Sequence, residues 1–168
     1  MHTKHGFTLI ELLAVVVILG ILTSIALPQY RKSIQRAEAA NALINVRAMF
    51  DAAKRYYATS STWPTSITNL DVEFLDIATV DHDGEDAFNM GEFQYSLINT
   101  NTLKGVAACR IANGETDGNY CLVAYYRLNG VRDVYECNYQ NSKYRSLCES
   151  LGTCPPVGST GANECTIE

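Results

Sequence analysis

The feature that most constrains this chain is an apolar run at its start. Across residues 7–27 the only formally charged side chain is Glu11. A run of about 20 apolar residues is long enough to cross a lipid bilayer as a helix. A cleaved secretory signal instead has about 7–15 apolar residues followed by an A-x-A-like cleavage site, and no such site follows the run. The run therefore predicts a helix that anchors the chain in a membrane.

Glu11 is out of place in such a helix. An ionised carboxylate costs about 2.5–3.5 kcal/mol at the bilayer centre, less near the interface, and usually has a partner. Lys4 lies seven positions before it. Cleavage after Gly6 would create a new α-amine at Phe7, four residues before Glu11, and positions i and i+4 meet on one helix face. The amine of a neighbouring copy of the chain is the alternative partner.

The segment from Gly6 to Glu11 reads GFTLIE, and an apolar helix and then Pro28 follow it. This pattern resembles the class III signal peptide of type IV prepilins and type II secretion pseudopilins. The resemblance is dense over residues 1–36, and over the head it is only architectural. It implies that a prepilin peptidase cleaves between Gly6 and Phe7 and that Phe7 is then N-methylated.

The same resemblance implies an assembly role for Glu11, which would meet the N-terminal amine of an adjacent subunit. The partners would be identical subunits in a helical filament, the prepilin peptidase, the inner-membrane pilus assembly machinery and, before assembly, the membrane. The precursor would reside in the inner membrane, and the filament would be extracellular on the cell surface.

A helix break is predicted near the end of the apolar run. Pro28 lacks a backbone donor and clashes with the preceding turn, and Gly20 lies in the same apolar half. In related filaments this stretch melts during assembly, so we expect either melting between Gly20 and Pro28 or a static kink.

Helical patterning resumes over residues 30–57. Apolar residues recur there at spacings of three and four, which indicates one buried stripe on an amphipathic helix. The stripe comprises Ala39, Leu43, Val46, Phe50, Ala53 and Tyr57. We expect this half to pack under a sheet, and the apolar half to protrude.

The remaining residues, 58–168, predict a globular head that begins with a loop. Alternating apolar residues predict strands over residues 92–98, 105–111, 121–128 and 131–137. Asn129-Gly130 between the last two favours a hairpin turn. The predicted class is α+β, with a sheet of three or four antiparallel strands across the helix. The domain organisation is a leader (1–6), a filament-core helix (7–29), an amphipathic half (30–57) and the head.

All six cysteines follow residue 100. Their even number, after an export-type segment, predicts disulfides rather than a zinc site, because CxxC is absent. Proximity along the predicted strands favours sequential pairing. The predicted bonds are Cys109–Cys121, Cys137–Cys148 and Cys154–Cys165.

The net charge of −5 argues against nucleic-acid binding. Residues 30–57 hold six basic and two acidic side chains, whereas residues 58–168 hold six basic and fifteen acidic ones. A positive flank beside the membrane thus carries an acidic head.

One acidic segment is a weak calcium candidate, and no other cofactor is predicted. Asp81, Asp83, Asp86 and Glu92 match several positions of an oxygen-rich calcium loop, but the usual glycine at its sixth position is missing. Catalysis finds no support, because His82 is the sole histidine after the leader and no nucleophile motif occurs.

The sequence therefore predicts a structural, non-enzymatic subunit of a type IV pilus that polymerises through its N-terminal helix. A type II secretion pseudopilin is the first alternative. A membrane-anchored binding domain that never polymerises is the second.

Overall fold

The computed structural model describes residues 8–73, 78–82, 85–112, 115–127, 132–159, 161 and 163–167. The chain forms two compact units, Met1–Ala37 and Glu38–Glu168. The boundary between them falls inside the first helix, α1 (Leu9–Ser60).

The amphipathic half of α1 buries the predicted stripe. Five of its six residues have at most 9% of their surface exposed, and Tyr57 is the exception at 41%. Tyr57 lies near the end of the helix, where the sheet covers less of its surface. The buried face is wider than predicted, because the stripe is joined by Ala42, Met49 and Ala52.

The predicted break does not interrupt α1 in the single chain, and melting during assembly remains a prediction. α1 continues without interruption through Gly20 and Pro28. Pro28 removes only one intrahelical hydrogen bond, the one that its missing N–H would donate to the carbonyl of Ser24. The apolar residues on both sides continue the helix, so this single loss does not end it.

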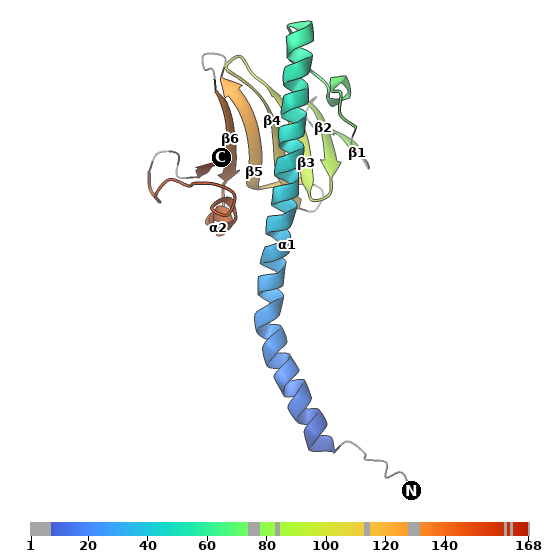
Figure 1. Ribbon diagram of the computed structural model, residues 1–168, viewed down its shortest axis with the longest axis vertical. Coiled ribbons are helices and arrows are strands. Elements are labelled where there is room, and N and C mark those ends of the chain that lie inside the picture. The colour runs from blue at the N-terminus through green and yellow to red at the C-terminus, as the bar shows by residue number, and fades with distance from the viewer. Residues whose placement is uncertain are drawn as a thin grey trace. The chain divides into compact units, whose positions relative to one another are not determined.

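The head contains one antiparallel sheet of seven strands in sequential order. The strands are β1 (Ala78–His82), β2 (Glu85–Met90), β3 (Phe93–Asn99), β4 (Leu103–Ala112), β5 (Glu115–Arg127), β6 (Asp133–Tyr139) and β7 (Glu164–Thr166). Short helices lie at η1 (Ile67–Asn69), η2 (Ser142–Tyr144) and α2 (Arg145–Cys148). Figure 1 shows the later turns of α1 lying across one face of this sheet.

The α+β class is confirmed, but the sheet is larger than predicted. β3, β4, β5 and β6 correspond to the four predicted strands, and β5 pairs with β6 as the hairpin prediction requires. The Asn129-Gly130 turn itself lies outside the described residues. Three strands were missed: β1, β2 and β7. Residues 69–91 lack a clear apolar period, and β7 is only three residues long, so neither region carries a strong strand signal.

The main core lies between α1 and the inner face of the sheet. Phe50, fully buried, is its centre, with ring centroids 6.1 Å from Tyr135 and 6.4 Å from Trp63. Alternate strand residues face this core, for example Val106 and Ala108 on β4. A second, smaller cluster occupies the outer face around Ala107, Val123 and Tyr125.

Candidate functional site at the N-terminal segment

The first described turn of the chain is a capping box built by Thr8 and Glu11. The Thr8 backbone N–H and hydroxyl donate to Glu11 Oε2 at 2.8 and 2.7 Å. The Glu11 N–H lies 3.3 Å from the Thr8 hydroxyl oxygen. This reciprocal arrangement is the S/T-x-x-E capping box, which satisfies orphan donors at a helix N-terminus. The T-L-I-E sequence carries this signal, so this cap was predictable from the sequence.

The Glu11 carboxylate is thus held by its own turn. Gly6 and Phe7, the predicted cleavage and methylation residues, lie outside the described residues. A new amine at Phe7 would adjoin Thr8, whose N–H and hydroxyl bind the carboxylate. A positively charged amine forms stronger hydrogen bonds with a carboxylate than neutral donors do, so it could displace them.

The apolar half of α1 exposes its side chains on all sides. Leu9 is 82% exposed, and large aliphatic residues remain about half exposed or more as far as Leu27. The helix is long and apolar enough to cross a membrane by length and composition. Its hydroxyls bond back to the helix, Thr23 to the Leu19 carbonyl and Ser24 to that of Ile21, both at 2.7 Å. Such a surface suits lipid or other apolar helices.

A charged cluster fixes the first head turn of α1 to the sheet. Arg110 on β4 has a side chain only 16% exposed, and its Nη1 lies 3.7 Å from Glu38 Oε2. Its Nη2 lies 3.8 Å from Glu92 Oε2 in the β2–β3 turn. Tyr120 on β5 is buried nearby, and burial raises its pKa to about 12 against the opposing effect of the Arg110 charge.

A second ion pair ties the later turns of α1 to the sheet. Lys54 Nζ donates to Asp133 Oδ2 at 2.7 Å and lies 3.8 Å from Asp51 Oδ1. The hydrogen bond to Asp133 is the main reason why the pKa of Lys54 is raised. These ties, and that of Arg110, were not predicted, because each joins residues far apart in sequence.

The three disulfides are those that the cysteine spacing predicts. Cys109–Cys121 joins β4 to β5, Cys137–Cys148 joins β6 to α2, and Cys154–Cys165 joins the following loop to β7. The last two hold the region after residue 139, where regular structure is short. They therefore add covalent links to a region that otherwise has one short strand, β7, paired with β6 and a few core side chains such as Leu147 and Ile167.

Part of the calcium-loop candidate lies on paired strands, where Asp81 on β1 is directly opposite Asp86 on β2. Asp83 lies outside the described residues, and the Glu92 carboxylate faces Arg110. Among the described residues, no group of three or more His, Cys, Asp or Glu side chains could hold a metal ion.

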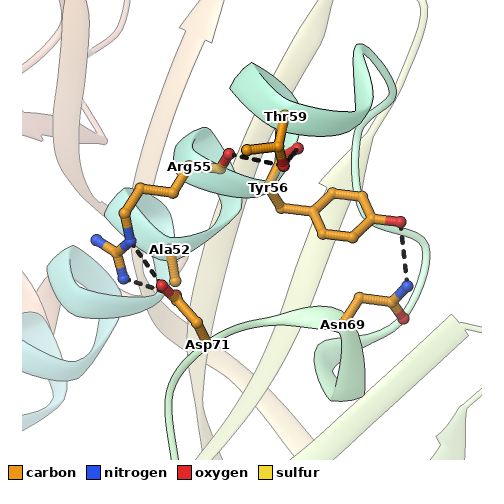
Figure 2. A pocket seen from close by; sticks show the side chains of 6 residues that line it. All are labelled: Ala52, Arg55, Tyr56, Thr59, Asn69 and Asp71. Carbon is orange, nitrogen blue, oxygen red and sulfur yellow. Dashed lines mark hydrogen bonds and ion pairs between the residues drawn. The ribbon is translucent and has the colours of Figure 1, made fainter.

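A small cleft of about 190 Å³ lies between the last turns of α1 and the η1 segment (Figure 2). Arg55 donates to both Asp71 oxygens, at 2.7 and 2.8 Å, along one side. Asn69 Nδ2 donates to the Tyr56 hydroxyl at 3.2 Å on the other. These polar groups pair with one another, so the cleft ties the segment to the helix and presents no reactive set.

The sequence of the chain was compared with those of known proteins. Residues 1–27 match the family described as the prokaryotic N-terminal methylation motif. A fimbrial protein of Pseudomonas aeruginosa is 32% identical over 115 residues, which cover 68% of this chain and 74% of that protein. This match extends well beyond the helix.

The chain belongs to the type IV pilin superfamily.

Two further relatives match over a shorter length. The fimbrial protein of Neisseria meningitidis serogroup A is 39% identical over 69 residues, 41% of each chain. The type IV major pilin protein PilE1 of Neisseria gonorrhoeae is also 39% identical over 69 residues, 41% of this chain and 42% of that pilin. The chain thus spans about two fifths of the length of these two relatives. No solved structure was found to match this pilin-superfamily chain.

Proposed function

We propose that the chain is the precursor of a structural subunit of a type IV pilus. The apolar half of α1 holds it in the inner membrane, and a prepilin peptidase cleaves between Gly6 and Phe7 and methylates the Phe7 nitrogen. Identical subunits then polymerise through α1 into a filament on the cell surface. The chemistry is done to this chain and not by it.

One observation carries the proposal: an exposed apolar helix bears a single carboxylate, Glu11, whose hydrogen bonds come from Thr8 in its own turn. Exposed aliphatic side chains need lipid or other helices around them. A carboxylate in that medium favours a cationic partner. The N-terminal amine of a neighbouring subunit supplies the cation, so docking removes both the exposed surface and the unpaired charge.

The stretch from Gly20 to Pro28 is where α1 would melt during assembly. Pro28 already lacks one backbone bond, and a Cβ on Gly20 would meet no atom within 4 Å. Local melting would divide α1 into two shorter helices joined by a more extended stretch, because extended backbone rises more per residue than a helix does. A filament density map with continuous helix across this stretch would remove this part of the proposal.

The names of the relatives favour a pilus over a secretion pseudopilus, because they are called fimbrial proteins and a major pilin. Deletion of the gene separates the two functions. If the chain is a pilus subunit, deletion of its gene should abolish surface filaments and leave type II export of proteins intact. Loss of export with filaments retained would identify a pseudopilin.

Replacement of Glu11 by Ala tests polymerisation. The precursor should still lose residues 1–6, measured as a mass change, while sheared surface filaments should be lost. Glu73→Gln, which neutralises an exposed carboxylate of the head, is the matched control and should assemble normally. Normal filaments from Glu11→Ala would refute assembly through this carboxylate and favour a membrane-anchored domain that never polymerises.

A further inference from the structure

Five side chains form one row across the outer face of the sheet, and a disulfide lies at its centre. Strand register places Asn89 opposite Gln94, Gln94 opposite Cys109, Cys109 opposite Cys121, and Cys121 opposite Asn138. Directly opposite residues share a face, with Cβ atoms about 4.5–5.5 Å apart. We call these five residues the amide row.

In the disulfide of the amide row both cysteines are partly exposed, which is true of neither other bond. Cys137, Cys148 and Cys165 are each 0% exposed, so both other bonds have at least one fully buried sulfur-bearing residue. Cys109 and Cys121 are both only partly buried, beside the small outer cluster. Thiol–disulfide exchange begins with a thiolate that reaches a disulfide sulfur, so access controls which bond opens.

Strand pairing holds Cys109 and Cys121 together even without their bond. β4 and β5 pair continuously from Leu103 opposite Arg127 to the cysteines, and pairing resumes beyond them. Opening this bond therefore releases no element. The other two bonds attach the four-residue helix α2 and the three-residue strand β7, which share far fewer residue pairs with the sheet than β4 and β5 share with each other.

The side-chain oxygen of Asn138 favours the reduced form of the Cys109–Cys121 pair. Its Oδ1 atom is buried and accepts no hydrogen bond in the described structure. The disulfide opposite has no proton to donate, whereas a cysteine thiol is a donor, if a weak one. A buried acceptor without a partner is unfavourable, so a Cys121 thiol would satisfy an oxygen that the disulfide leaves unpaired.

We propose that Cys109–Cys121 is a thiol–disulfide exchange site, opened by a dithiol reductant while the head stays folded. A thiolate of the dithiol attacks one sulfur, forming a mixed disulfide, and the other cysteine leaves as a thiolate that takes up a proton. The second thiol of the reductant then attacks the mixed disulfide and releases the first cysteine. Two electrons pass to the protein, and the reductant becomes a disulfide.

Dithiothreitol with stepwise alkylation tests the site in the full-length chain in detergent micelles. Free thiols are blocked at each reductant concentration, and peptides are identified by mass spectrometry. Cys109 and Cys121 should become alkylated at about tenfold lower dithiothreitol than any other cysteine, with the circular dichroism of the head unchanged. Earlier labelling of Cys137 or Cys154, or simultaneous labelling of all six with loss of structure, would overturn the proposal.

Asn138→Ala tests the role of the orphan acceptor. Half-reduction of Cys109–Cys121 should need about fivefold more dithiothreitol, because the thiol loses its acceptor. Asn89→Ala is the matched control: its Oδ1 is also buried without a partner, but the residue lies two strands from the nearest cysteine and should shift nothing. Equal shifts in both variants, or none in Asn138→Ala, would overturn the role assigned to Asn138.

Discussion

Cys137 and Cys165 lie directly opposite each other on β6 and β7, yet each is bonded to a different cysteine. The Ile167 N–H donates to the Tyr135 carbonyl at 2.8 Å, two residues along the same ladder. Alternation along an antiparallel ladder therefore makes Cys137 and Cys165 a hydrogen-bonded pair, in which opposite residues lie farther apart. Strand proximity alone does not decide the pairing here.

Peptide mapping without reduction should recover three linked pairs. The expected links are Cys109–Cys121, Cys137–Cys148 and Cys154–Cys165. A sample alkylated before digestion should carry no label, since every cysteine is bonded. A peptide that joined Cys137 to Cys165 would contradict the pairing. It would show that Cys137 bonds its opposite residue on β7 and not Cys148 of α2.

Arg110→Met should destabilise the head by about 2 kcal/mol, measured by urea denaturation. The substitution keeps the apolar stem but leaves the half-buried Glu38 carboxylate without its cation. Adding Glu38→Gln to the same variant should recover part of the loss, because the unpaired charge is then gone.

Arg55→Met is the control for that measurement. Arg55 and Asp71 make a closer contact, at 2.7 Å, but both side chains are more than half exposed. Exposed pairs contribute about 0–1 kcal/mol, so this variant should be nearly neutral. If Arg55→Met lowered the unfolding free energy more than Arg110→Met did, burial of the ion pair would not be what determines its contribution to stability.

Thr8→Val should loosen the first turn of α1. The valine side chain neither donates to Glu11 nor accepts from its N–H, so only the backbone N–H bond to the carboxylate remains. Loss of such a side-chain cap costs about 1 kcal/mol. Amide hydrogen exchange in micelles should become several-fold faster in the first turn. Thr23→Val, which removes a hydroxyl bonded to the Leu19 carbonyl within the helix, should leave that turn unchanged.

Alkaline pH should destabilise the head through Tyr120. Its pKa is raised from 10.0 to about 12 by burial, so the folded state keeps a proton that the unfolded chain loses. The stabilising contribution is complete below pH 10 and is lost as the pH rises toward 12. The loss should reach about 2 kcal/mol. Tyr120→Phe should show a shallower decline in unfolding free energy over this range, and an identical decline would refute the assignment.

Strong local signals made half of the fold predictable. The stripe from Ala39 to Ala53 follows the helical period, and Phe93, Tyr95 and Leu97 alternate with the strand period. Such periodicity needs no knowledge of distant residues. These segments are therefore the ones whose type, and approximate bounds, the sequence predicts.

The missed hairpin shows where local pattern fails. β2 and β3 are joined by Gly91-Glu92, and Gly91 has a φ of 60°. Glycine at the first turn position is a hairpin signal, but residues 69–91 had no clear apolar period to place a strand beside it. The strand β2 is supported by its neighbours, through pairing with both β1 and β3.

By itself the sequence determined the apolar run, the position of Glu11 within it, and the amphipathic stripe, because each depends on neighbours along the chain. Only the tertiary structure decided that Glu38 lies beside Arg110 and that Cys121 lies opposite Asn138. Arg110 is 72 positions after Glu38, and Asn138 is 17 after Cys121. Such contacts depend on strand register, and a shift of one residue would move every side chain to the other face.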